Sequence, residues 1–134
     1  MANGLYTTFL SALMNKQLDL DTDQINVALL DSGYTVNLTV QDHYSAYCAA
    51  HQIQTGILSN NTITSGVFNA DNYEFPNVTH GSNAKYIVVY HDTTDQLIAY
   101  FDTDSNGAID IPCIGNDIHT EWNASGILAF AGCP

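Results

Sequence analysis

Apolar residues recur at helical spacing in the first segment of the chain and mostly at strand spacing after it. Residues 4–15 predict an amphipathic helix, whose apolar face consists of Leu5, Phe9, Ala12 and Leu13. Asn3 stands where an N-cap residue belongs. Residues 42–50 predict a second short helix, because alanine favours helix and Asp42 can cap it.

The remaining apolar runs predict strands separated by turn residues. Residues 85–90 and 96–101 are rich in β-branched and aromatic side chains and predict a hairpin. Pro76 is expected to end its strand or to mark a sheet edge. The last strand is expected to pair with the strand before it. Further strands are predicted at 25–30, 57–58, 62–64, 67–75, 117–122 and 127–130.

Short strands separated by turns favour an antiparallel arrangement. The chain is therefore predicted to be mainly β, an antiparallel β-sandwich or open barrel of about six to eight strands. An N-terminal helix would cover one end or edge of the sheet, and a second short helix would follow. With 134 residues, residues 1–134 are expected to form a single structural domain.

The charge balance narrows the function classes. The chain has 14 acidic residues and only two basic ones, Lys16 and Lys85, which gives a net charge of −12. Binding to nucleic acid or to an anionic membrane requires several Lys or Arg residues, so neither partner is expected. The absence of arginine also excludes arginine clamps for phosphate or carboxylate substrates.

Composition also bears on the setting in which the protein works. Charged residues make up only 12% of the chain, so amides and hydroxyls must solvate most of its surface, which suits a protein within an assembly. We see no signal peptide and no transmembrane run, and expect assembly in a bacterial cytoplasm. The three cysteines, Cys48, Cys113 and Cys133, are expected to be free thiols.

The segment from Asp102 to Asp110 is the sharpest candidate for chemistry. Asp102, Asp104 and Asn106 followed by glycine match the first half of an EF-hand calcium loop. The position that requires a bidentate glutamate is Cys113, and the preceding run predicts a strand, so an EF-hand is rejected. A calcium site in a β-loop remains as an alternative to our preferred interpretation, a solvated hairpin loop.

Other chemical residues are interpreted as structural. The row Asp19, Asp21 and Asp23 is expected to be an exposed strand entrance, although such a row could hold a hard cation. The glutamates Glu74 and Glu121 are expected to be surface positions rather than a glycosidase pair. Trp122 is assigned to the core. A zinc site would require a second ligand pair close to His43, Cys48 and His51.

Two segments of the chain carry a resemblance to known proteins. The first comprises Asn3 to Tyr6, Phe9-Leu10, Ala12-Leu13, Leu18 to Asp23, Ile25 and Val27 to Asp31. The second comprises Leu97 to Thr103, Gly115 to Ile118, Trp122, Gly126-Ile127 and Phe130. Together they resemble a family of small virion proteins of tailed bacteriophages, often capsid decoration (cement) proteins. The chain departs from the family pattern in residues 41–56 and 103–115.

The resemblance implies a non-enzymatic protein on the outer surface of an icosahedral head, with no catalytic, cofactor or metal residue. The implied partner is the major capsid protein, and self-association as a homo-dimer or homo-trimer is expected. Residues 2–6 and the 41–51 loop are predicted to contact the shell. The alternatives are a tail or neck protein and a calcium-dependent binding module that uses the 102–110 loop.

Overall fold

The computed structural model describes residues 4–20, 22–64, 67–104, 107–120, 122 and 128–129. In this part of the chain, eight strands have three or more residues, and the remaining four strands have two residues each. All strand pairs are antiparallel. One N-terminal helix and one short second helix accompany them. The predicted mainly β fold, with about six to eight strands and two helices, is confirmed.

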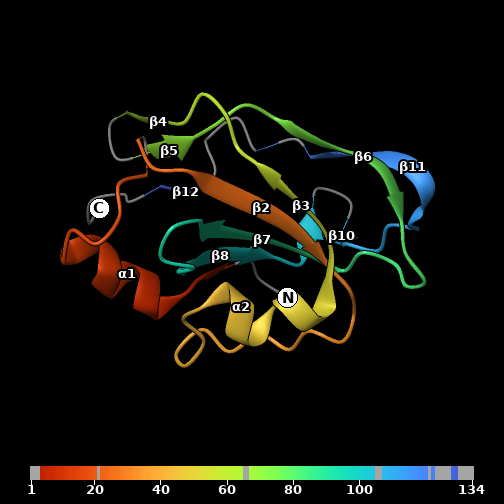
Figure 1. Cartoon of the computed structure of the whole chain (residues 1–134), viewed down its shortest axis with the longest axis horizontal. Coiled ribbons are helices and arrows are strands. Elements are labelled where there is room, and N and C mark those ends of the chain that lie inside the picture. Colours follow the sequence, from red (N-terminus) through yellow and green to blue (C-terminus); the bar gives the residue numbers. More distant parts are fainter. Residues whose placement is uncertain are drawn as a thin grey trace.

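A five-stranded sheet forms the centre of the molecule (Figure 1). Its order is β1 (Gly4–Leu5), β8 (Leu97–Phe101), β7 (Tyr86–His91), β2 (Ile25–Leu30) and β3 (Gln52–Ile57). Every residue of β2 is buried, because the strand lies inside the sheet with both of its faces covered. The predicted strands at 25–30 and 85–90 and the 85–101 hairpin are confirmed.

Three smaller sheets complete the fold. Strand β6 (Tyr73–Thr79) pairs with β11 (Ile114–Thr120). Strand β5 (Val67–Asn69) lies between β4 (Thr62–Thr64) and β12 (Leu128–Ala129). The third sheet is the short hairpin of β9 (Thr103–Asp104) and β10 (Gly107–Ala108).

The helices and the small sheets cover opposite faces of the central sheet. Tyr44 of helix α2 (Tyr44–Tyr47) stacks on Tyr90, with ring centroids 3.9 Å apart. Gly56 of β3 contacts the Tyr73 ring of β6 from the other face. In Figure 1 the helices lie below β2, whereas β4, β5, β6 and β11 lie above it. The arrangement is therefore layered, as a sandwich requires.

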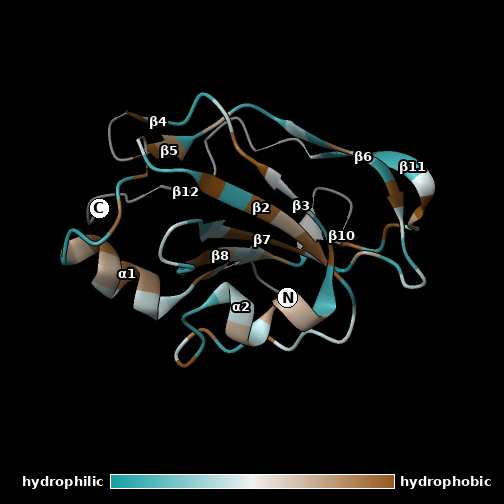
Figure 2. Ribbon diagram, viewed as in Figure 1, coloured by the Kyte–Doolittle hydropathy of each residue, from teal (hydrophilic) through white to brown (hydrophobic). Residues whose placement is uncertain are grey.

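Apolar side chains are concentrated in the central sheet, whereas the connecting loops and much of β11 are hydrophilic (Figure 2). Phe9 and Ala12 are the buried residues of helix α1 (Thr7–Met14), which packs beside β8. The largest fully buried side chains include Tyr6, Tyr34, Phe9, Phe75, Ile25, Leu29 and Leu30. The core is therefore formed mainly between α1, the central sheet and β6.

The first helix begins later than predicted. Gly4 and Leu5 form β1, which pairs with Tyr100 and Ala99 of β8, and α1 starts at Thr7. The Thr7 amide donates to the Leu38 carbonyl at 2.9 Å, so a distant loop caps the helix. The predicted cap, Asn3, lies outside the described residues.

Several strand predictions also require correction. A two-residue strand was predicted at 57–58, but β3 covers 52–57. The polar side chains of this edge strand hide its strand pattern in the sequence. The predicted 67–75 strand is two strands, and β6 continues through Pro76, which fits the predicted edge position. The last strand pairs with β5 rather than with β11.

Candidate interaction surface

The 102–110 segment forms a hairpin, as our preferred interpretation predicted. Strands β9 and β10 pair with Asp104 opposite Gly107, and the Ile109 amide donates to the Asp102 carbonyl at 2.9 Å. Residues 105–106 lie outside the described residues. Asp110 accepts from Asn83 at 2.8 Å and pairs with the Lys85 ammonium at 3.0 Å. These two contacts hold the pKa of Asp110 below its usual value, so a calcium ion would have to displace a lysine there.

The residues considered for zinc have separate partners. His43 pairs with Asp42 at 2.9 Å, and His51 lies 3.4 Å from Asp31. Cys48 is completely buried, and burial raises the pKa of its thiol to about 12. In the described part of the chain, no group of three His, Cys, Asp or Glu residues could hold a metal ion.

The acidic row at 19–23 is a turn, where a strand entrance was expected. The Asp19 amide donates to the Asp23 carboxylate, and the Asp23 amide donates to the Asp19 carbonyl, each at 2.9 Å. Asp23 therefore closes its own turn. Asp21 lies outside the described residues, so the structure tests only part of the row.

A buried histidine, which no sequence pattern singles out, joins this turn to the β7–β8 hairpin. His91 is 2% exposed, and its Nε2 lies 2.7 Å from the Asp23 carboxylate. Its Nδ1 accepts the Thr94 amide at 3.1 Å and lies 2.8 Å from the Thr94 hydroxyl. Because the amide already uses the Nδ1 lone pair, this set lacks a free base to activate Thr94. Its role is to fix two turns 68 residues apart in sequence.

A second buried polar network lies under the helices. The hydroxyl of Tyr6 hydrogen-bonds to that of Tyr34, and Tyr34 donates to the Gln41 side-chain oxygen at 2.5 Å. Gln41 in turn donates to the Thr35 carbonyl at 2.7 Å. Burial raises the pKa values of Tyr6 and Tyr34 well above the usual tyrosine range. The network therefore stays neutral and holds the 34–41 loop against the sheet.

Helix α2 is positioned by the β7–β8 turn rather than by Asp42, the predicted cap. The Ser45 amide and hydroxyl both donate to the Asp95 carboxylate, at 2.8 and 2.5 Å. The Tyr44 amide donates to the Asp95 carbonyl at 2.8 Å. With the Tyr44–Tyr90 stack, these bonds fix the helix on the sheet, so its outer side chains have a defined position.

The exposed side chains of this segment are mostly uncharged, with Asp42, whose side chain is 42% exposed, as an acidic neighbour. We call the uncharged part the α2 patch and define it as the exposed residues Val40, Ala46, Tyr47, Ala49 and Ala50. It overlaps the predicted 41–51 contact region, in which Gln41, Tyr44 and Cys48 are buried instead. The predicted 2–6 contact does not fit at Tyr6, which is 0% exposed, or at Leu5, which is half-buried within β1. Residues 2–3 lie outside the described residues.

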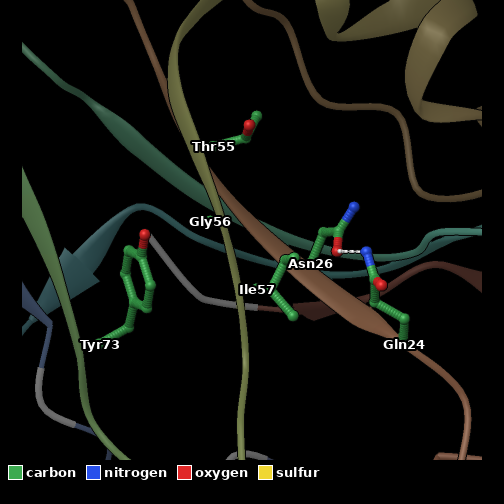
Figure 3. A pocket seen from close by; sticks show the side chains of 6 residues that line it. All are labelled: Gln24, Asn26, Thr55, Gly56, Ile57 and Tyr73. Carbon is green, nitrogen blue, oxygen red and sulfur yellow. Dashed lines mark hydrogen bonds between the residues drawn. The ribbon is translucent and has the colours of Figure 1, made fainter.

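A second surface feature is a shallow hollow along β3, with a volume of about 530 Å³. Figure 3 shows β3 in front of β2, with Tyr73 on one side of it and Asn26 and Gln24 on the other. The lining also includes Thr55, Gly56 and Ile57, so it contains no charged side chain. The Gln24 amide donates to Asn26 at 3.1 Å.

The remaining candidates are accounted for by local contacts. Glu74 is exposed on β6 and lies 3.8 Å from His119 of β11, whereas Glu121 lies outside the described residues. Trp122 is half-buried, packs at 5.8 Å from the Phe101 ring and donates to the Asp71 carbonyl at 3.1 Å. Among the described residues, no helix is long and apolar enough to cross a membrane.

Comparisons with protein-family models, with curated protein sequences and with solved structures find no match to this chain.

Proposed function

We propose that the protein is a non-enzymatic capsid decoration protein that binds the outer surface of a bacteriophage head. The observation that carries the proposal is the uncharged α2 patch on a protein of net charge −12. Packaged DNA repels such a chain, and the outside of a shell is the location that avoids this repulsion. The segments that resemble tailed-phage virion proteins add a second, independent reason.

The mechanism proposed is mechanical. A copy that binds across the joint between two capsomers of the major capsid protein adds contacts that must break before the shell opens. A ligand that binds only the closed shell stabilises it by mass action. Because many copies bind one shell, each copy needs to contribute only a few kcal/mol.

The α2 patch is the proposed contact with the shell. Its alanines and Tyr47 offer close approach with no charge to desolvate, and aromatic residues are enriched in interfaces. Helix α2 is also fixed by Asp95 and Tyr90, so little ordering is required when the patch binds. The low charge of the patch distinguishes it from the acidic turn at 19–23.

The direct test is cryo-electron microscopy of the particle that contains the protein. Density on the icosahedral shell at on the order of hundreds of copies supports the proposal, because shell symmetry sets that number. About six or twelve copies at the neck, or stacked rings in the tail tube, would replace it with the tail or neck alternative. Absence of the protein from the particle would reject both.

Two charge variants test the contact surface. Ala46→Glu places a carboxylate in the α2 patch, and Ile114→Glu places the same group on β11, where Ile114 is 81% exposed. Both are added to heads that lack the protein, and bound copies are counted after sedimentation. We expect Ala46→Glu to bind at least about tenfold more weakly, which corresponds to 1.4 kcal/mol. If only Ile114→Glu loses binding, the contact with the shell lies on β11 instead of on the α2 patch.

A further inference from the structure

Strand β3 forms an edge of the central sheet with an open side. It pairs with β2 in a register that places Gly56 opposite Val27 and Thr55 opposite Ala28. The Leu58 amide donates to the Ile25 carbonyl at 2.9 Å, so the backbone groups of Leu58 face β2. By the alternation of an antiparallel ladder, the backbone groups of Thr55 and Ile57 face away from β2.

These outward backbone groups have room for another strand. Within the described part of the chain, no hydrogen bond reaches the backbone of Thr55 or Ile57. The hollow of Figure 3 surrounds this stretch of β3, because Thr55, Gly56 and Ile57 line it together with Tyr73 on one side and Gln24 and Asn26 on the other. Strand β6 packs over one face of β3, where Tyr73 contacts Gly56, and so leaves the edge open.

The sequence of β3 lacks most of the devices that protect edge strands from pairing. Native edges are blocked by charged residues, prolines or bulges. Strand β6 has Glu74 and Pro76, and its partner β11 has Asp117 and two register shifts. Strand β3 has neither charge nor proline over its six residues, and its one register shift lies at the Gln52 end.

We propose that β3 pairs with β3 of a second copy of this chain across a twofold axis at Thr55. In that register Thr55 faces Thr55 of the partner subunit, and Ile57 faces the partner's Ile53. Residues opposite each other on paired strands project to the same face. The twofold axis therefore creates two Ile53–Ile57 pairs, one on each side of Thr55. The two five-stranded sheets become one continuous ten-stranded sheet.

The symmetry of the β3 sequence favours a second copy over an unrelated partner strand, and the absence of charge on β3 is compatible with it. Two chains of net charge −12 repel, so they approach most easily where neither one carries charge. Strand β3 and the lining of the hollow are such a place. The Ile-x-Thr-x-Ile pattern is also symmetric about Thr55, which is the requirement of a twofold interface. This inference does not rest on the proposed capsid role.

The first test is the molar mass in solution, measured by sedimentation velocity over a concentration series through the micromolar range. Edge interfaces are short, so we expect a dimer that dissociates on dilution. Thr55→Pro removes an outward amide that has no hydrogen-bond partner among the described residues of its own chain, and we expect it to be monomeric. Thr55→Ala keeps that amide and should still form the dimer. Circular dichroism checks that both variants are folded.

A cross-linking pair tests the register. Thr55→Cys places two thiols directly opposite each other, within the Cα separation that a disulfide permits. Ile57→Cys places its thiols about 13 Å apart along the strands. We therefore expect an oxidised dimer from Thr55→Cys well above the level of the parent chain, and none from Ile57→Cys.

Three results would overturn the inference. The first is a parent chain that stays monomeric throughout the concentration series. The second is a dimer that survives Thr55→Pro or that cross-links through Ile57→Cys in preference to Thr55→Cys. The third is a chain that is monomeric alone and uses the β3 edge only on the phage shell, with Thr55→Pro blocking shell binding. That last result would assign the edge to a strand of the capsid protein.

Discussion

Gly56 lies directly beneath the ring of Tyr73. A β-carbon built on Gly56 would be 2.1 Å from Tyr73 Cζ and 2.3 Å from its hydroxyl oxygen. The missing side chain therefore allows β6 to approach the central sheet closely at this point. The Gln54 side chain also donates to the Pro76 carbonyl at 3.2 Å, so β3 holds β6 by two contacts.

The first prediction concerns this close approach. Gly56→Ala forces the Tyr73 ring or β6 to move, and we expect a loss of about 1–3 kcal/mol in the free energy of unfolding. The measurement is urea denaturation. Gly81→Ala is the matched control, because a β-carbon there has no atom within 4 Å. The loss should shrink in the Tyr73→Ala background, and an unchanged loss there would contradict the contact as its cause.

The second prediction concerns the end of helix α1. The Gln17 amide donates to the Ala12 carbonyl and the Lys16 amide to the Leu13 carbonyl, at 2.9 and 3.1 Å. This is a Schellman motif, and Lys16 occupies its left-handed position with φ of 61°. Glycine adopts that conformation without cost, so Lys16→Gly should be more stable than Lys16→Ala by about 1 kcal/mol.

Comparison of these two variants removes the effect of charge, because both lack the lysine. Thermal unfolding at neutral pH is sufficient to rank them. Equal stabilities would mean that the left-handed conformation at residue 16 costs nothing, contrary to the geometry.

The third prediction concerns acid. The hydrogen bond from His91 lowers the pKa of Asp23, so the folded state favours its charged form. The resulting stability is fully present above the unfolded pKa of about 3.9 and is lost as pH falls through the lower folded pKa. Asp23→Asn should cost about 1 kcal/mol at pH 7, after allowance for screening at this partly exposed group.

The same variant should unfold with a weaker dependence on pH below about 4, and its difference from the parent should fade there. Urea denaturation across that pH range measures both effects. A constant difference between the two proteins at all pH values would show that the His91 contact does not depend on the charge of Asp23.

The amino-acid sequence predicts the elements that depend on local pattern. The strands at 25–30 and 85–90 are rich in apolar side chains and largely buried, and a hairpin turn follows the second run, so local pattern is sufficient to assign them. The start of α1 was misplaced, because Gly4 and Leu5 have helical spacing and their pairing with β8 is a tertiary interaction that periodicity does not contain.

The candidate surface was harder to predict than the fold. The 41–51 region was selected, but Tyr44 and Cys48 face inward because α2 stacks on Tyr90, a residue 46 positions away from Tyr44. The β3 edge was missed, because the strand has only two strongly apolar side chains, Ile53 and Ile57, among glutamine, threonine and glycine. An edge strand is defined by the partner it lacks, and sequence periodicity reports only the faces of a strand.

The fourth prediction concerns the cap that holds α2. Asp95 has a φ of 64°, and its carboxylate accepts two hydrogen bonds from Ser45 of the first helical turn. Asp95→Ala removes the single carboxylate oxygen that accepts both bonds and places alanine in a left-handed conformation, so a loss of about 2 kcal/mol is expected. Asp95→Asn replaces the charged acceptor with a neutral amide oxygen and tolerates that conformation, and should lose about half as much.

Hydrogen exchange can separate a local role of this cap from a global one. The amides of β2 and β7 report global unfolding. If Asp95 mainly fixes α2, Asp95→Ala should accelerate exchange of the 45–48 amides, relative to the parent chain, more than exchange of the β2 and β7 amides. An equal acceleration at all of these amides would instead show that Asp95 contributes to the global stability of the fold. In the local case Asp95→Ala should also weaken binding through the α2 patch, although residue 95 lies outside that patch, because binding must then order the helix.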